Sequence, residues 1–348
     1  MDNPETEDQL PEQSQEPDQT PACIECGKRP VLEGYPNALC GSCREKFLKF
    51  PVPKWVSGFG IAVLLLVAFG LVSFPAQIST GLHLKRAENA AKNKNFLTAK
   101  KELTKVLESS PNLTSAEVQL MIADFYNMDE YGFAVLAKKL SGQKIESSED
   151  LSAANELAGE MQNYFPSDSL TQMKARFSDS VDIPRDSLRQ YIVSHDSDPY
   201  ALVSYLNLYY DKEDLRWSDS AIKKLLSDHP DYLPGILTAI YITRMEGKYD
   251  SALKYCDELL SFNHELSYAG AAKARVLMAE GKLEPGIAQA KTTLEADPDD
   301  GYANATLALG YHLNHQYPER DKIISVSAKD SIKAGYMEYV NNNLRRIP

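Results

Sequence analysis

Four of the chain's five cysteines lie within one short stretch near the N-terminus, and their thiols offer the clearest potential for chemistry. Cys23 and Cys26 form a pair separated by two residues, and Cys40 and Cys43 form a second pair with the same spacing. Two intervening residues allow one tight turn to direct both sulfurs toward a single ion. The pattern therefore predicts that Cys23, Cys26, Cys40 and Cys43 bind one metal ion. Cys256 stands alone, and we expect it to be a small buried side chain.

The predicted metal site has four protein ligands, which fill the tetrahedral coordination shell of Zn²⁺ and leave no position for water or substrate. We therefore expect a structural zinc ion rather than a catalytic one, held by a module spanning residues 21–50. Zinc would supply roughly 10–16 kcal/mol of apparent binding free energy, which so short a segment cannot obtain from a hydrophobic core. Iron in the same four-sulfur shell and a pair of disulfides are the alternatives. The segment resembles a zinc ribbon or a zinc knuckle.

Catalytic signatures are absent from the sequence. It contains no P-loop, no HExxH motif, no GxSxG motif and no GxGxxG motif. The irregular stretch 141–200 is rich in serine and aspartate but shows no recognisable arrangement of nucleophile and base. We therefore expect that the protein is not an enzyme.

The distribution of charge excludes one class of partner and identifies one segment. The net charge of −12 argues against general binding to nucleic acid, because phosphate backbones attract basic surfaces. Residues 1–20 are acidic, contain proline and have few apolar side chains. Such a segment buries too little surface to offset its ordering entropy, so we predict a disordered acidic tail.

An uncharged segment separates the cysteine module from the rest of the chain. Residues 55–74 contain no charged side chain, and a helix of this length spans roughly 30 Å, the thickness of the bilayer hydrocarbon. Pro53 and Pro75 bracket the segment, and Trp55 stands at one edge, where an indole favours the membrane interface. The pattern predicts one transmembrane helix, with the lipid bilayer as a partner. A buried core helix is the alternative.

The residues that flank the uncharged segment indicate an orientation. Lys46, Lys49 and Lys54 lie close to its N-terminal end, whereas the first basic residues on the other side are Lys85 and Arg86. Basic flanks favour the cytoplasmic side, and free thiols persist best in a reducing compartment. We therefore expect a single-pass protein of the plasma (inner) membrane, with a cytoplasmic N-terminus and an extracytoplasmic C-terminal domain.

The second half of the sequence repeats at a fixed interval. The strings GKYDSAL and GKLEPGI begin at Gly247 and Gly281, and LLS at 225–227 recurs at 259–261. Both recurrences have the same step, here called the repeat length, and a step of about 34 residues is the length of one helix–turn–helix unit. The period therefore predicts consecutive helix pairs.

Apolar residues follow a helical period almost without interruption from about residue 83 onward. We predict an all-α, helical-repeat domain at residues 82–348, because a single helix pair cannot bury its own apolar face and must stack on its neighbours. One second helix is expected to be three residues short, since DSAI begins at residue 219 and DSAL at residue 250, which is less than one repeat length later.

Small residues at fixed positions carry a resemblance to the tetratricopeptide repeat (TPR) family. In that family small side chains occupy the points where the two helices of a unit cross, because a large side chain would force them apart. Ala252 and Gly286 fit this place in the second helix, and Ala274 and Ala308 fit it in the first. The resemblance is closest over residues 200–315 and implies a TPR-like solenoid.

The sequence also departs from the family at the end of one unit. Pro230 and Pro298 match the proline that closes a unit, whereas His264 replaces it in the unit between them. The family's tryptophan is absent from the first helix of each unit. The resemblance supports a fold and partner binding, and it implies no chemistry.

The family resemblance implies a concave surface where a protein or peptide partner binds. This surface is lined by the first helices of the units, and aromatic and arginine side chains are the usual anchors at such interfaces. By this analogy, the partner-binding residues are Tyr241, Arg244, Tyr268, Arg275, Tyr302 and His312.

Together these patterns predict a membrane-anchored TPR scaffold or adaptor. Its repeat domain would bind a protein or peptide, and its structural zinc module would lie on the other side of the membrane. The alternative is a transmembrane signalling regulator whose zinc ribbon acts on a cytoplasmic or transcriptional partner. The regulator differs from the scaffold because it requires coupling through the membrane helix.

Overall fold

The computed structural model describes residues 21–28, 30–48, 53–177, 183–195, 198–209 and 215–327. The predicted disordered tail, residues 1–20, and the last part of the predicted repeat domain, residues 328–348, lie outside the described residues. The chain divides into two compact units, Met1–Ser73 and Phe74–Pro348, and the boundary between them falls within one helix.

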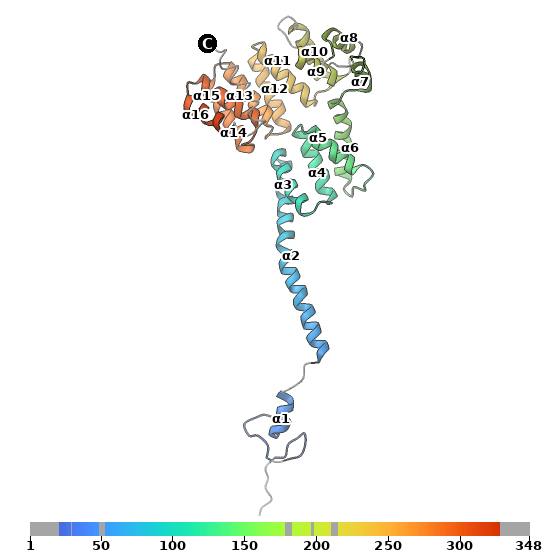
Figure 1. Ribbon diagram of the computed structural model, residues 1–348, viewed down its shortest axis with the longest axis vertical. Coiled ribbons are helices and arrows are strands. Elements are labelled where there is room, and N and C mark those ends of the chain that lie inside the picture. Colours follow the sequence, from blue (N-terminus) through green and yellow to red (C-terminus); the bar gives the residue numbers. More distant parts are fainter. Residues whose placement is uncertain are drawn as a thin grey trace, which may run out of the picture. The chain divides into compact units, whose positions relative to one another are not determined.

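Every regular element in the described ranges is a helix (Figure 1), which confirms the all-α prediction. The first unit contains α1 (Gly41–Leu48) and the beginning of α2 (Lys54–Lys92), which continues into the second unit. The second unit then contains α3 (Phe96–Ser109), α4 (Thr114–Tyr126), α5 (Glu130–Leu140), α6 (Ser148–Met161), η1 (Gln162–Tyr164), α7 (Asp168–Lys174), α8 (Arg185–Ser194), α9 (Pro199–Tyr209), α10 (Leu215–Asp228), α11 (Leu233–Met245), α12 (Tyr249–Phe262), α13 (Ser267–Ala279), α14 (Leu283–Ala296), α15 (Gly301–Leu313) and α16 (Tyr317–Ser327).

The helices from α9 to α16 follow the predicted period. The first helices α9, α11, α13 and α15 each begin one repeat length after the previous one, and the second helices α10, α12, α14 and α16 keep the same step. Each helix packs on its neighbours in the chain, so these helices form stacked TPR-like pairs (Figure 1).

The expectation of one shortened helix is wrong. Helices α10 and α12 both contain 14 residues, and they begin one full repeat length apart. The DSAI string begins at the fifth residue of α10, whereas DSAL begins at the second residue of α12. The two strings therefore match in letters but occupy different turns of their helices.

The first half of the domain has the same period in a different phase. Helix α5 begins one repeat length after α3, and α6 begins one repeat length after α4. Helix α9, however, begins one and a half repeat lengths after α6. The phase therefore shifts across η1, α7 and α8, where the sequence resembles the family least.

The small residues of the repeat lie at helix crossings, as predicted. Ala252, Ala274 and Ala308 are fully buried. A Cβ added to Gly286 would lie 2.9 Å from the carbonyl oxygen of Ala274 and 2.7 Å from Cγ of Met278. The interior is packed too closely to admit even one additional methyl group at this crossing without a shift.

The crossing at Gly286 yields a prediction in which one substitution has opposite effects at two positions. Gly159 is an exposed glycine of α6 with nothing near its missing Cβ, so Gly159→Ala should raise the free energy of unfolding by up to about 1 kcal/mol through helix propensity. Gly286→Ala should lower it by about 1–3 kcal/mol, because the new methyl group meets backbone. Thermal and urea unfolding of the two variants measure both changes. Stabilisation by Gly286→Ala would contradict this account of the crossing.

A residue with left-handed backbone recurs at one position in five of the described turns between paired helices. Gly247, Gly281 and His315 have φ of +73°, +90° and +58°, and they are spaced by one repeat length. Lys94 and Met128 repeat this conformation in the first half with the same spacing. Glycine adopts positive φ without steric cost, which gives the recurring GK strings a physical reason. At Lys94, Met128 and His315 the same turn position accommodates a residue other than glycine.

A group of hydrogen bonds, here called the clasp, joins the first helices of the domain to the turn between α12 and α13. The backbone amide of His264 donates to the carbonyl oxygen of Lys94 at 2.9 Å. The backbone amide and the hydroxyl of Thr98 donate to the two carboxylate oxygens of Glu265, each at 2.7 Å. These partners come from opposite halves of the repeat domain, so the clasp connects the two halves. The clasp comprises Lys94, Phe96, Thr98, Tyr126, Asn127, Asn263, His264 and Glu265.

Asn263 lies at the centre of the clasp and is fully buried. Its Oδ1 accepts hydrogen bonds from the backbone amides of Phe96 and Glu265 at 3.3 and 3.1 Å. Its Nδ2 donates to the carbonyl oxygen of Tyr126 at 3.1 Å and to Oδ1 of Asn127 at 2.9 Å. The side-chain amide thus uses both of its donors and both of its acceptor positions.

The clasp explains why the sequence departs from the family pattern at His264. The equivalent positions in the neighbouring repeats are Pro230 and Pro298, and proline has no backbone N–H. Only a residue other than proline can donate the hydrogen bond that Lys94 accepts from this position.

Candidate functional site

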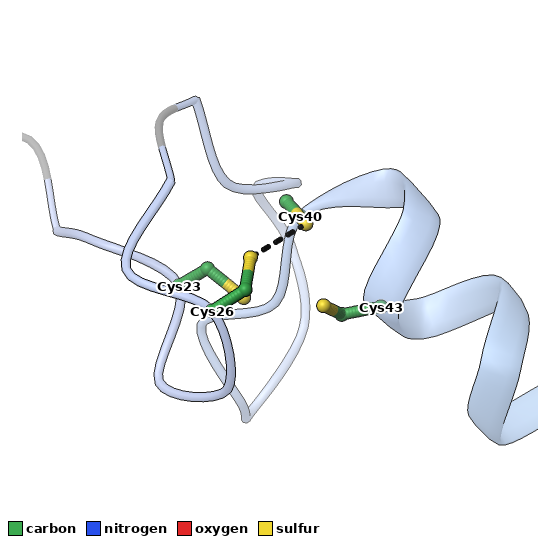
Figure 2. Close-up of side chains that lie close together, drawn as sticks. All are labelled: Cys23, Cys26, Cys40 and Cys43. Carbon is green, nitrogen blue, oxygen red and sulfur yellow. Dashed lines mark hydrogen bonds between the residues drawn. The ribbon is translucent and has the colours of Figure 1, made fainter.

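The four clustered cysteines converge on one point in the first unit (Figure 2). Cys23 and Cys26 lie in one turn, Cys40 directly precedes α1, and Cys43 lies in the first turn of α1. All four sulfurs lie within 4.8 Å of one another, and Cys26 Sγ is 3.6 Å from Cys40 Sγ. Tetrahedral Zn²⁺ with Zn–S bonds of about 2.3 Å places its sulfurs about 3.8 Å apart. The predicted ligands therefore form a cluster whose donor set and spacing fit zinc.

Backbone and hydroxyl groups around the cluster favour the thiolate forms of Cys23 and Cys40. The backbone amide of Cys40 lowers the pKa of the Cys23 thiol. The Ser42 hydroxyl lies 3.3 Å from Cys40 Sγ, and this hydrogen bond lowers the pKa of the Cys40 thiol to about 6. The hydrogen bond to Cys26 raises the pKa of Cys43 to about 12. Neighbouring thiolates repel one another, so a bound cation would favour ionisation of all four cysteines, and metal binding would release protons.

The module around the cysteines has very little apolar core. Its buried apolar residues are Cys23, Leu39, Cys40 and Cys43, and Val31 packs against them. Its described residues form turns and the helix α1, so the strands of a zinc ribbon are not among them. A core of this size does not hold a fold by itself, which favours a structural role for the metal.

The fifth cysteine behaves as predicted. Cys256 is fully buried in α12, and burial raises the pKa of its thiol to about 12. A thiol that stays protonated at neutral pH is a poor nucleophile and a poor metal ligand. Cys256 is therefore a packing residue of the repeat.

The uncharged segment lies in α2 and exposes its apolar side chains. Phe59, Leu66 and Phe69 are 66%, 70% and 71% exposed. No helix among the described residues combines the length and the apolarity needed to cross a membrane. The predicted span 55–74 ends in residues 71–74, whose side chains lie outside those described.

Four of the six predicted partner-binding residues line one cavity of about 400 Å³ in the repeat domain: Tyr241, Arg244, Tyr268 and Tyr302. The rings of Tyr268 and Tyr302 are stacked, with centroids 5.5 Å apart. Arg275 is outside the lining, but its guanidinium lies over the Tyr302 ring, 4.2 Å from the ring centroid, where a cation is attracted to the aromatic face. The structure thus places four of the predicted residues around one cavity and a fifth, Arg275, in contact with one of them.

The sixth predicted residue, His312, does not belong to this cavity lining. Its Nδ1 lies 2.9 Å from Nη1 of Arg320, and its ring packs edge-on against Tyr317. Burial and the charge of Arg320 lower the pKa of His312. These contacts assign His312 to packing between α15 and α16.

The cavity contains residues that the sequence reasoning missed. Met128 lies in the turn between α4 and α5 and Glu130 is the first residue of α5, both in the first half of the domain, whereas Leu237 belongs to α11. Asn263 of the clasp binds Tyr126 and Asn127, which directly precede Met128 in the chain. The clasp therefore helps to hold one wall of the cavity. No local sequence pattern predicts this contact.

Serine and aspartate residues of the stretch 141–200 form a hydrogen-bonded network between helix ends. Ser167 donates to Oδ2 of Asp198 at 2.7 Å, and the Tyr191 hydroxyl donates to the same oxygen at 2.9 Å. Ser167 also accepts from the amide of Leu170, and Asp198 from that of Ala201, so the two residues cap α7 and α9. Helix capping accounts for these polar side chains in structural terms.

Comparisons with known proteins give little beyond this internal evidence. No family model matches the chain, and no curated protein matches it at a significant level. A tetratricopeptide repeat protein from Parabacteroides merdae is 12% identical and aligns over 75% of this chain and 98% of its own, with a TM-score of 0.37. PilF from Pseudomonas aeruginosa is 12% identical and aligns over 77% and 99%, with a TM-score of 0.32. The assignment of a TPR-like fold therefore depends on the repeat within the chain itself.

Proposed function

We propose that this chain is a membrane-anchored TPR-like scaffold that binds a protein or peptide through the aromatic cavity and catalyses no reaction. The observation that carries the proposal is the cavity itself. Tyr241, Tyr268 and Tyr302 supply aromatic surface, and Arg244 supplies a cation within the same lining. Tyrosine and arginine are the residues that most often dominate the energy of binding at interfaces.

We propose further that α2 anchors the chain in a lipid bilayer, with the zinc module in the cytoplasm and the repeat domain outside. Support comes from the uncharged residues 55–74 and from side chains such as Leu66 and Phe69, which are 70% and 71% exposed in the part of the chain that the structure describes. The cluster of lysines on the N-terminal flank and the free thiols of the module support the orientation.

Cross-linked capture in cells tests partner binding by the full-length chain. Tyr268→Ala should lower the yield of the captured partner at least about tenfold, because truncation of an anchor typically costs about 2 kcal/mol or more. Tyr131→Ala is the matched control, since Tyr131 is 82% exposed and is not part of the cavity lining. Equal capture by the wild type and Tyr268→Ala would contradict the assignment of this cavity.

Protease treatment of sealed membranes tests the anchor and its orientation. A protease added outside should digest the repeat domain and spare the zinc module until detergent opens the membrane. Digestion of the zinc module from outside would reverse the orientation. Recovery of the full-length chain in the soluble fraction without detergent would reject the anchor.

A further inference from the structure

The aromatic cavity contains two opposite charges that do not pair with each other. Glu130 and Arg244 both line the cavity, and among the described residues no salt bridge joins either of them to another side chain. The Arg244 guanidinium lies 5.6 Å from the centroid of the Tyr241 ring. A ligand can therefore meet a carboxylate at one place in the cavity and a guanidinium at another.

The two charges lie near opposite ends of α11. Tyr232 is the residue before α11, and burial raises the pKa of its hydroxyl, with a smaller contribution from the nearby charge of Glu130. Arg244 lies in the last turn of the helix. Between these ends, Pro234, Leu237 and Tyr241 line the cavity at helical spacing. From Pro234 to Arg244 a helix rises about 15 Å. The cavity thus follows α11 lengthwise, with an acidic end, an apolar middle and a basic end.

We propose that this cavity binds an extended peptide segment of about five residues, with a cationic group at the Glu130 end, a carboxylate at the Arg244 end and an apolar side chain between them. An extended chain covers about 3.3–3.6 Å per residue, so about five residues cover the length between the two charges. The inference rests on the proposed function and specifies the charge pattern of its partner.

The electrostatics of the empty cavity agree with such a ligand. Burial raises the pKa of Glu130, and the negative charge of Asp129 raises it further, so a cation beside Glu130 would stabilise its charged form. A guanidinium group such as that of Arg244 matches the geometry of a carboxylate and can bind it with two parallel hydrogen bonds. A cavity of about 400 Å³ lies at the small end of ligand sites, which suits a short segment rather than a folded domain.

Two fluorescently labelled, end-capped pentapeptides test the inference: Lys-Ala-Phe-Ala-Glu and its reverse, Glu-Ala-Phe-Ala-Lys. Their binding is measured by fluorescence anisotropy to the full-length chain in lipid nanodiscs. At least one order should bind with a micromolar Kd. Glu130→Gln and Arg244→Gln should each weaken that binding at least tenfold, because each removes one charge pair from a half-buried site. Exposed residues of the same types provide matched controls, and Glu284→Gln and Arg86→Gln should leave the Kd unchanged.

A charge exchange separates loss of recognition from loss of folding. The Glu130→Lys variant should no longer bind the peptide that the wild type binds. It should instead bind a version of that peptide whose lysine is replaced by glutamate. The inference would be overturned if neither peptide binds, or if the Kd is unchanged by Glu130→Gln and Arg244→Gln. If the peptides fail while cellular capture still depends on Tyr268, the proposed function survives and this charge pattern does not. If capture is also independent of Tyr268, both fail.

Discussion

Replacing Cys43 with serine is expected to abolish stoichiometric zinc binding and to unfold the N-terminal module. Cys43 supplies one of four sulfurs within 4.8 Å of one another, and a serine hydroxyl at this position stays protonated and is a weak zinc ligand. Structural zinc contributes roughly 10–16 kcal/mol of apparent free energy, and the small core around Leu39 cannot replace it. The free energy lost with zinc binding is therefore expected to exceed the free energy of unfolding of the N-terminal module, so the module should unfold.

Elemental analysis of the purified full-length chain measures this effect. The wild type should contain about one zinc per chain after exposure to a weak chelator, and Cys43→Ser close to none, with faster proteolysis of residues 21–48. Cys256→Ala is the control, because Cys256 lies in the repeat domain and should leave the zinc content unchanged. Undiminished zinc in Cys43→Ser would reject the site. Iron in place of zinc, or protected disulfides, would favour the alternative interpretations of the same four cysteines.

Asn263→Ala is expected to open the clasp and to lower the free energy of unfolding of the repeat domain by roughly 2–4 kcal/mol. The substitution removes four hydrogen bonds from a fully buried amide. It also leaves the backbone amide of Phe96 and the carbonyl of Tyr126 without these partners. Each buried polar group that loses its partner costs about 1–3 kcal/mol, with partial recovery where water enters.

Hydrogen exchange of the full-length chain resolves where the clasp opens. Asn263→Ala should accelerate exchange at Phe96 and Thr98 and in the turn at Met128, and it should weaken partner capture because that turn forms a wall of the cavity. Asp297→Ala changes the equivalent position one repeat later, whose side chain makes no hydrogen bond in the described structure, and should have little effect. Similar exchange in the two variants would contradict the role given to Asn263.

A second variant isolates one hydrogen bond of the clasp. His264→Pro introduces the residue found at Pro230 and Pro298 and removes only the N–H that binds Lys94. The backbone of Asn263 is extended, with φ of −145° and ψ of 110°, which a following proline accepts. We expect destabilisation of about 1 kcal/mol, the usual net value of one hydrogen bond. A neutral or stabilising result would show that the clasp does not depend on His264.

Local and periodic features of this protein could be predicted from its sequence. The spacing of Cys23, Cys26, Cys40 and Cys43 predicts their clustering as candidate metal ligands, because cysteines separated by two residues share one turn. The repeat length predicts the helix pairs and the small residues at their crossings, because each unit repeats the same packing problem against its neighbour. Tyr268 and Tyr302, one period apart, fall on one surface for the same reason.

Only the tertiary structure decides which distant parts of the repeat domain meet. Neither the half-repeat shift nor the clasp has a periodic signature in the sequence. The shift interrupts the period between α6 and α9, and the clasp joins segments, such as those of Phe96 and Asn263, that lie more than one repeat apart. The sequence marked His264 as an exception, but the reason for it, a hydrogen bond to Lys94, lies at the opposite end of the repeat domain's sequence. Glu130 belongs to the first half of the domain, yet it lines the cavity together with Leu237 and Tyr268 from the second half. Hydrogen bonds between remote segments depend on where the whole chain places them, and local residue patterns do not encode that placement.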